Sequence, residues 1–98
     1  MRKAGASGQD FAETLALQAL GWLVGNAELL PAFLGATGAS PAELRARAAD
    51  PDFLLSVLDF LLMDDAWVVA FCDAAGHRYA EPLAAREALA GGAGMHWT

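Results

Sequence analysis

The sequence is poor in the residues that perform most protein chemistry. It contains one cysteine, Cys72, and two histidines, His77 and His96, among 98 residues. A single cysteine excludes an internal disulfide, and these three side chains are too few for a structural zinc site, which needs four Cys or His ligands. We therefore expect neither a metal nor any other cofactor.

Positive charge is also scarce. Six Lys and Arg residues face twelve Asp and Glu residues, so the formal net charge is −6. Proteins that bind DNA or RNA usually gather Lys and Arg on one face, where they displace counterions. An acidic chain repels nucleic acid, so the composition disfavours it as a partner.

Long hydrophobic runs are absent. A membrane-spanning helix needs about 18 apolar residues, and the longest candidate here, residues 15–24, is interrupted by Gln18 and Gly21. Arg2 and Lys3 are followed by small and polar residues, not by the apolar core of a signal peptide. We expect a cytoplasmic protein that does not contact a membrane.

Apolar residues, in contrast, are abundant. They make up 56% of the chain, above the roughly 45–50% of ordinary domains, which excludes disorder over most of its length. The surplus also hints that a partner, such as a second copy, covers part of the surface.

Helix start and stop signals divide the chain. Ser40-Pro41 with Glu43, Asp50-Pro51, and Asp64 are typical of helix starts. Glycines after helices are typical stops, and we expect a left-handed stop at Gly25 and an end at Gly91-Gly92. The predicted helices span residues 10–24, 27–36, 41–49, 51–62, 65–75 and 81–89.

Strands are not expected, because no stretch alternates apolar and polar residues for long and β-branched residues are few. The predicted fold is all-α, a compact bundle of about six short helices. One domain covers residues 10–90, with flexible tails at 1–9 and 91–98. Trp97 falls in the second tail.

The two halves of the chain resemble each other. A shift of 38 residues places 14–46 over 52–84 without gaps, so that Phe33 meets Phe71 and Gly38 meets Gly76. The pattern predicts two similar three-helix units, with the helices at 10–24 and 51–62 in the centre. Each of these two helices carries a polar stripe at positions i, i+4 and i+7 along one face. The stripe is Thr14, Gln18 and Gly21 in the first helix and Asp52, Ser56 and Asp59 in the second.

The helix at 51–62 is apolar on every other side, so neighbouring helices must cover it from several directions. Asp59 lies in its polar stripe, although the residues next to it are Leu58 and Phe60. We interpret Asp59 as exposed to solvent or paired with an arginine, not as a buried functional carboxylate.

A set of residues carries a family resemblance over most of the chain between the first and fifth predicted helices. They are Phe33-Leu34, Thr37-Gly38, Pro41, Leu44-Arg45, Phe53-Leu54, Val57-Leu58-Asp59-Phe60-Leu61, Asp64-Asp65 and Phe71-Cys72. The combination resembles a family of small bacterial proteins known only as a domain of unknown function. The resemblance implies a cytosolic helical protein and carries over no catalytic or ligand-binding residue.

Cys72 and His77 form the pattern closest to an enzyme site. A Cys–His nucleophile needs hydrogen-bond contact and a third, orienting group. Cys72 falls in an apolar stripe with Val68 and Phe71, so we interpret it as an inert, buried thiol. No catalytic residue is assigned, and we expect a protein that is not an enzyme.

The segments 27–36 and 41–49 have the length of a helix-turn-helix with a glycine, Gly38, in the turn. In that interpretation Arg45 and Arg47 contact nucleic acid, although the domain is acidic and the second helix offers no Asn or Gln to read bases. The leading hypothesis is a non-enzymatic protein–protein interaction or oligomerisation module. The helix-turn-helix regulator is the alternative.

Overall fold

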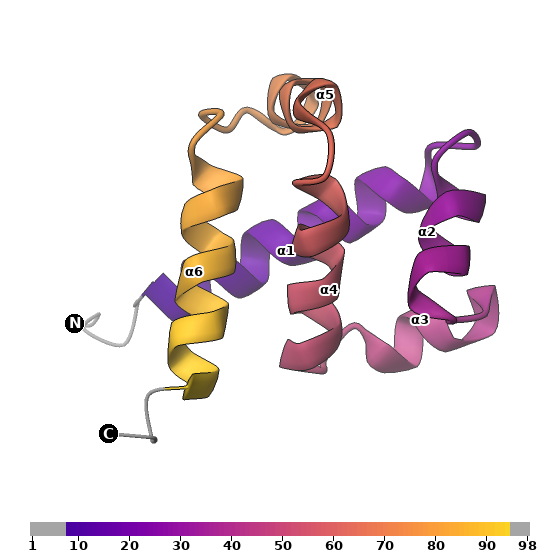
Figure 1. Cartoon of the computed structure of the whole chain (residues 1–98), viewed down its shortest axis with the longest axis horizontal. Coiled ribbons are helices and arrows are strands. Elements are labelled where there is room, and N and C mark those ends of the chain that lie inside the picture. The colour runs from indigo at the N-terminus through magenta and orange to yellow at the C-terminus, as the bar shows by residue number, and fades with distance from the viewer. Residues whose placement is uncertain (1–7, 95–98) are drawn as a thin grey trace.

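The structure, a computed structural model, describes residues 8–94 and contains six helices and no strand in that range. The predicted all-α fold is confirmed. The helices are α1 (Gly8–Val24), α2 (Leu30–Thr37), α3 (Pro41–Arg47), α4 (Pro51–Leu61), α5 (Asp65–Ala75) and α6 (Glu81–Gly94) (Figure 1).

Capping hydrogen bonds are present at the predicted starts of α3, α4 and α5. The Asp50 carboxylate accepts a hydrogen bond from the Asp52 amide at 2.9 Å, and Asp64 accepts one from the Ala66 amide at 2.8 Å. The Ser40 amide donates to Glu43 Oε1 at 2.8 Å, as in a capping box. Each contact satisfies an amide that would otherwise lack a partner, which is why α3, α4 and α5 begin where the sequence predicts.

The predicted left-handed stop at Gly25 is wrong. Among the described residues only Gly38 and Gly76 have positive φ, 74° and 82°, and they end α2 and α5. After α1 the chain instead makes a turn over residues 27–29. The Asn26 side chain caps this turn, because its Oδ1 accepts hydrogen bonds from the Glu28 and Leu29 amides at 3.1 Å each. This turn uses the residues expected to begin α2, so α2 starts at Leu30.

Other predicted helix ends also differ from the structure, and α3 ends at Arg47 instead of residue 49. The first helix begins at Gly8 instead of residue 10, and α6 continues through Gly91-Gly92 to Gly94. A glycine weakens a helix by about 1 kcal/mol but does not forbid it. Residues 1–7 and 95–98, including Trp97, lie outside the described residues, so most of the predicted tails is not part of this description.

Three helices form the centre of the molecule. The closest packing is between α1 and α6, α1 and α4, and α4 and α6. Figure 1 shows α1 running behind α4 and α6, with α5 across one end and α2 and α3 on the far side of α4 from α6. The prediction that α1 and α4 are central is therefore confirmed, and α6 shares that position.

Neighbouring helices cover α4 on several sides, as its wide apolar surface predicts. Its buried side chains are Phe53, Leu54, Val57, Leu58, Phe60 and Leu61. Phe33 of α2 packs edge-to-face on Phe53 and Phe60, with ring centroids 5.9 and 5.4 Å apart. Asp52 and Asp59 remain exposed along the polar stripe.

The helix order repeats between the two halves, but the packing does not. α6 packs closely on α1 and α4, whereas α3, its counterpart in the first half, has no comparably close neighbour. Leu44 is nonetheless buried. Because α3 packs less closely than α6, one face of α1 beside α3 stays uncovered.

Candidate functional site

The Cys72 thiol is not prepared for nucleophilic chemistry. Its side chain on α5 is buried, and Sγ donates a hydrogen bond to the Arg78 carbonyl at 3.4 Å. Burial raises the pKa of the Cys72 thiol above its ordinary value, and the carboxylates of Glu81 and Asp73 raise it further. Because the thiolate is the reactive form, this environment favours the unreactive neutral thiol. The predicted burial of Cys72 is confirmed.

His77 joins three helices. It follows α5, its Nδ1 lies 2.7 Å from Glu81 Oε1 at the start of α6, and its Nε2 contacts Gln18 Oε1 of α1. Its ring also lies on Phe71, with the centroids 5.7 Å apart. With both nitrogens and one ring face occupied, His77 holds α1, α5 and α6 together and is not oriented toward Cys72 as a base.

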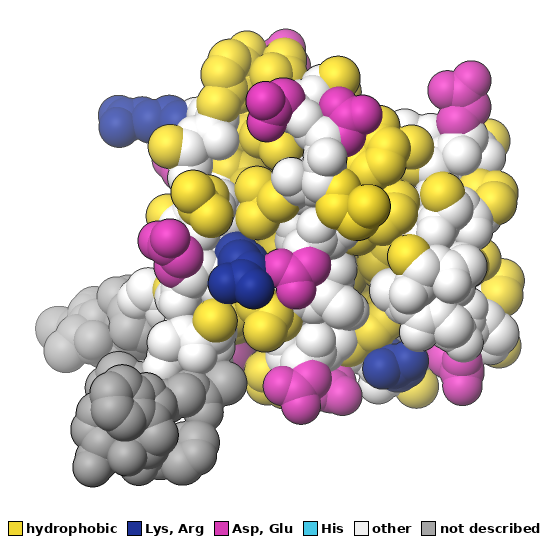
Figure 2. All heavy atoms as spheres, viewed as in Figure 1, with side chains coloured by type: hydrophobic (Ala, Val, Ile, Leu, Met, Phe, Trp, Pro, Cys, Tyr) yellow, Lys and Arg dark blue, Asp and Glu magenta, His cyan; other side chains and the backbone are white. Residues whose placement is uncertain are grey.

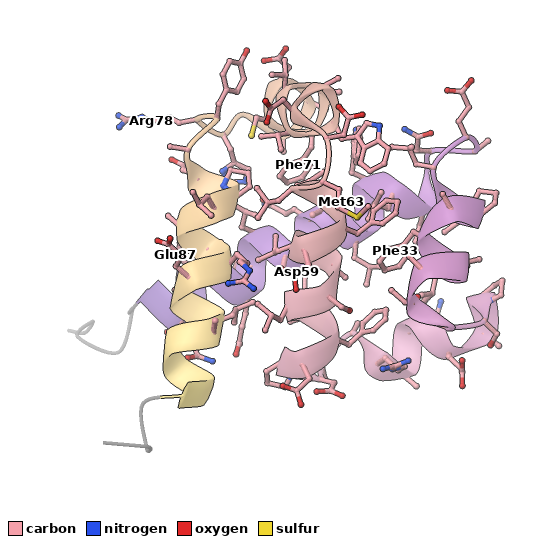
Figure 3. The ribbon with its side chains drawn as sticks, viewed as in Figure 1. Phe33, Asp59, Met63, Phe71, Arg78 and Glu87 are labelled. Atoms are coloured by element: carbon pink, nitrogen blue, oxygen red, sulfur yellow. The ribbon has the colours of Figure 1, made fainter. Side chains whose placement is uncertain are left out.

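Asp59 is exposed and paired, as the sequence predicts. Its Oδ1 lies 2.6 Å from Arg86 Nε, so α4 and α6 are joined at the surface. The carboxylate is half exposed, and Figure 3 shows Asp59 on the side of α4 that faces α6. The pair has the character of a surface ion pair and not of a catalytic acid.

Between residues 8 and 94 no three His, Cys, Asp or Glu side chains are grouped so that they could hold a metal ion. Nor is any helix in that range both long enough and apolar enough to cross a membrane.

The two arginines predicted to contact nucleic acid have different surroundings. The Arg47 guanidinium lies 4.6 Å from the centroid of the Phe53 ring and is thus held against α4. Arg45 is exposed and has no ion pair or hydrogen bond from its side chain within residues 8–94. Since α3 is only seven residues long, it offers a short recognition helix, and nucleic-acid contact by Arg45 and Arg47 stays a prediction.

One hollow opens between α2, α3 and α4. It has a volume of about 510 Å³, and its lining mixes apolar, hydroxyl and charged groups: Ala36, Thr37, Arg47, Asp52, Ser56, Asp59, Phe60 and Met63. Figure 2 shows the apolar side chains between α4 and α2 with acidic groups spread around them, and Figure 3 places Met63 at the α5 end of this face. Its charged groups largely pair within the chain, Asp59 with Arg86 and Arg47 with Phe53.

A second hollow is more apolar and lies between α1 and α3. It has a volume of about 410 Å³, and we call it the α1–α3 groove. Its lining residues are Leu17, Leu20, Gly21, Val24, Pro41, Leu44, Arg45 and Ala48. Arg45 is the sole charged residue in this lining.

The wall of the α1–α3 groove continues onto an outward stripe of α1. Leu17 and Val24 lie in this stripe and are 45% and 47% exposed, with the exposed Gly21 between them. The sequence predicted a polar stripe at Thr14, Gln18 and Gly21 and did not identify these two apolar residues. Their spacing of seven, two turns of one helix face, was the available signal.

Comparison with known proteins identifies a family for this chain. No curated protein matches the chain, and no solved structure does. Residues 9–92 match the model of a family described as "Protein of unknown function (DUF3572)", which covers all six helices apart from the first residue of α1 and the last two of α6. Because the match spans most of the sequence, the chain belongs to this family of unknown function.

Proposed function

We propose that the protein is a non-enzymatic protein–protein interaction domain and that the α1–α3 groove is its contact surface. The observation that carries the proposal is the pair of half-exposed side chains Leu17 and Val24 in the lining of an apolar groove. Apolar surface left in water costs about 25 cal/mol per Å², so a partner that covers these two side chains would gain free energy from their burial.

The chemistry of the remaining side chains supports a binding role over catalysis. Cys72 is buried with its pKa raised, and His77 is held by Glu81 and Gln18. An enzyme of this type would need a nucleophile and a base in contact and open to a substrate. The described residues do not combine those properties.

Photo-crosslinking inside cells tests the proposal. We would replace Leu17 by p-benzoylphenylalanine and, as a matched control, Leu83 of α6, which is 50% exposed and lies outside the groove. We expect a crosslinked adduct of discrete mass from position 17 and none from position 83. Adding Val24→Glu should abolish the adduct, because it puts a charge into the same apolar wall.

The two outcomes that contradict the proposal are distinct. No adduct from position 17 means that the groove is not a contact surface in the cell. Equal adducts from positions 17 and 83 mean that proteins meet this domain without regard to the groove.

A further inference from the structure

We infer that the occupant of the α1–α3 groove is a second copy of this chain, packed so that the two α1 helices run antiparallel about a twofold axis at Leu17. This inference rests on the proposed function and names the partner. Twofold dimers are the commonest homo-oligomers, and their interface presents one surface patch to itself.

The residue spacing on α1 fits such a pairing. Asp10, Leu17 and Val24 follow one another at intervals of seven, so they lie nearly in line on the exposed face. Each interval corresponds to about 10.5 Å along the helix. Antiparallel helices that meet at Leu17 therefore place Leu17 against Leu17, and Asp10 of each copy against Val24 of the other.

Charge complementarity selects this arrangement. Arg45 lines the same groove as Val24, so Asp10 of the second copy would reach it. Asp10 and Arg45 are both exposed, and neither side chain has an ion-pair partner within residues 8–94. The twofold axis forms the cross pair twice, whereas parallel helices would set Asp10 against Asp10.

Gly21 leaves room for the second helix. A Cβ built at this position would meet nothing within 4 Å, so the fold of the single chain does not require glycine there. An alanine would be about 1 kcal/mol more favourable in a helix. A glycine one turn from Leu17 lets the backbone of a second α1 approach closely.

The overall charge makes the cross pairs important for orientation. Two copies that each carry −6 repel at long range, so an isologous contact forms best where opposite charges face each other. The apolar stripe then supplies most of the affinity, and Asp10 with Arg45 sets the direction of the helices.

Charge reversal tests the inference by sedimentation equilibrium. We expect the wild-type chain to show twice the 10.2 kDa mass of one copy. Asp10→Arg and Arg45→Asp should each raise the dimer dissociation constant about tenfold, because two exposed pairs become repulsive. The double variant should return toward wild type. Arg78→Asp, at an exposed arginine that does not line the groove, is the control and should leave the dimer unchanged.

The failures are distinguishable. A wild-type chain that stays a monomer at every concentration overturns the second copy, and a crosslink from Leu17 to a different protein would then leave the proposed function standing. If the dimer of the double variant loses as much association free energy as the two single variants together, the antiparallel register is overturned. Circular dichroism of each variant ensures that lost association is not lost folding.

Discussion

At the scale of single residues, the surroundings of a side chain decide its chemistry. Cys72 and His77 are close in sequence, but Cys72 is a buried residue of α5, whereas the His77 ring is bound by oxygens of α1 and α6. The sequence predicted the buried thiol, because Cys72 follows Val68 and Phe71 in an apolar stripe. It could not predict that Gln18 meets His77, since a contact across 59 positions depends on how the helices pack.

The raised pKa of Cys72 has a consequence for stability at alkaline pH. In the unfolded chain the thiol loses its proton near its ordinary value of 9.0, whereas in the folded chain it keeps the proton to higher pH. The folded state thus binds more protons in that window, and stability falls as pH rises through it. We expect this contribution to be complete below the ordinary value and lost above it.

Urea unfolding under reducing conditions, from about pH 7 to about pH 10, measures this effect. The wild-type chain should lose more free energy of unfolding over that range than Cys72→Ala, which lacks the titrating group and shares all the others. Parallel pH profiles for the two proteins would show that Cys72 titrates normally in the folded state.

At the scale of helices, capping and apolar periodicity predicted most of the boundaries. The starts of α3, α4 and α5 follow from the residues at their caps. Asp50 and Asp64 each accept a hydrogen bond from a free amide, and the Ser40 amide donates one to the Glu43 carboxylate. The start of α2 was missed because Asn26 caps a separate turn. The end of α6 was missed because glycine lowers helix stability without determining where a helix stops.

The central position of α4 predicts how its residues respond to truncation. Leu58 is fully buried, so Leu58→Ala should lower the free energy of unfolding by about 2–5 kcal/mol through lost burial and a residual cavity. Leu83→Ala makes the same chemical change at a half-exposed position and should stay within about 0.5 kcal/mol. Denaturant titration of both variants decides, and similar costs at the two positions would contradict a central α4.

At the scale of the whole molecule, the sequence predicted the fold class and the burial of α4 among other helices. It did not predict that the two halves pack differently. The match between residues 14–46 and 52–84 led to similar units, whereas α6 packs closely on α1 and α4 and α3 has no comparably close helix neighbour. Periodicity reports which face of a helix is apolar but not which neighbour covers it. The uncovered stripe at Leu17 and Val24 therefore became visible only in the assembled structure.

The α1 helix consequently has two roles in this account. Its inner face, with Leu15, Ala19 and Leu23, builds the core with α4 and α6. Its outer stripe, with Leu17 and Val24, is the surface that we propose to meet a second copy of the chain. The surplus of apolar residues in the composition is then divided between a core and a contact surface.

An isotope-filtered nuclear Overhauser experiment on an equal mixture of ¹³C-labelled and unlabelled protein tests this claim most directly. Antiparallel pairing of α1 about Leu17 predicts cross-peaks between copies that join the methyl groups of Leu17 in one copy to those of Leu17 in the other. Cross-peaks between copies that involve Leu83 instead, or no cross-peaks at all, would contradict it.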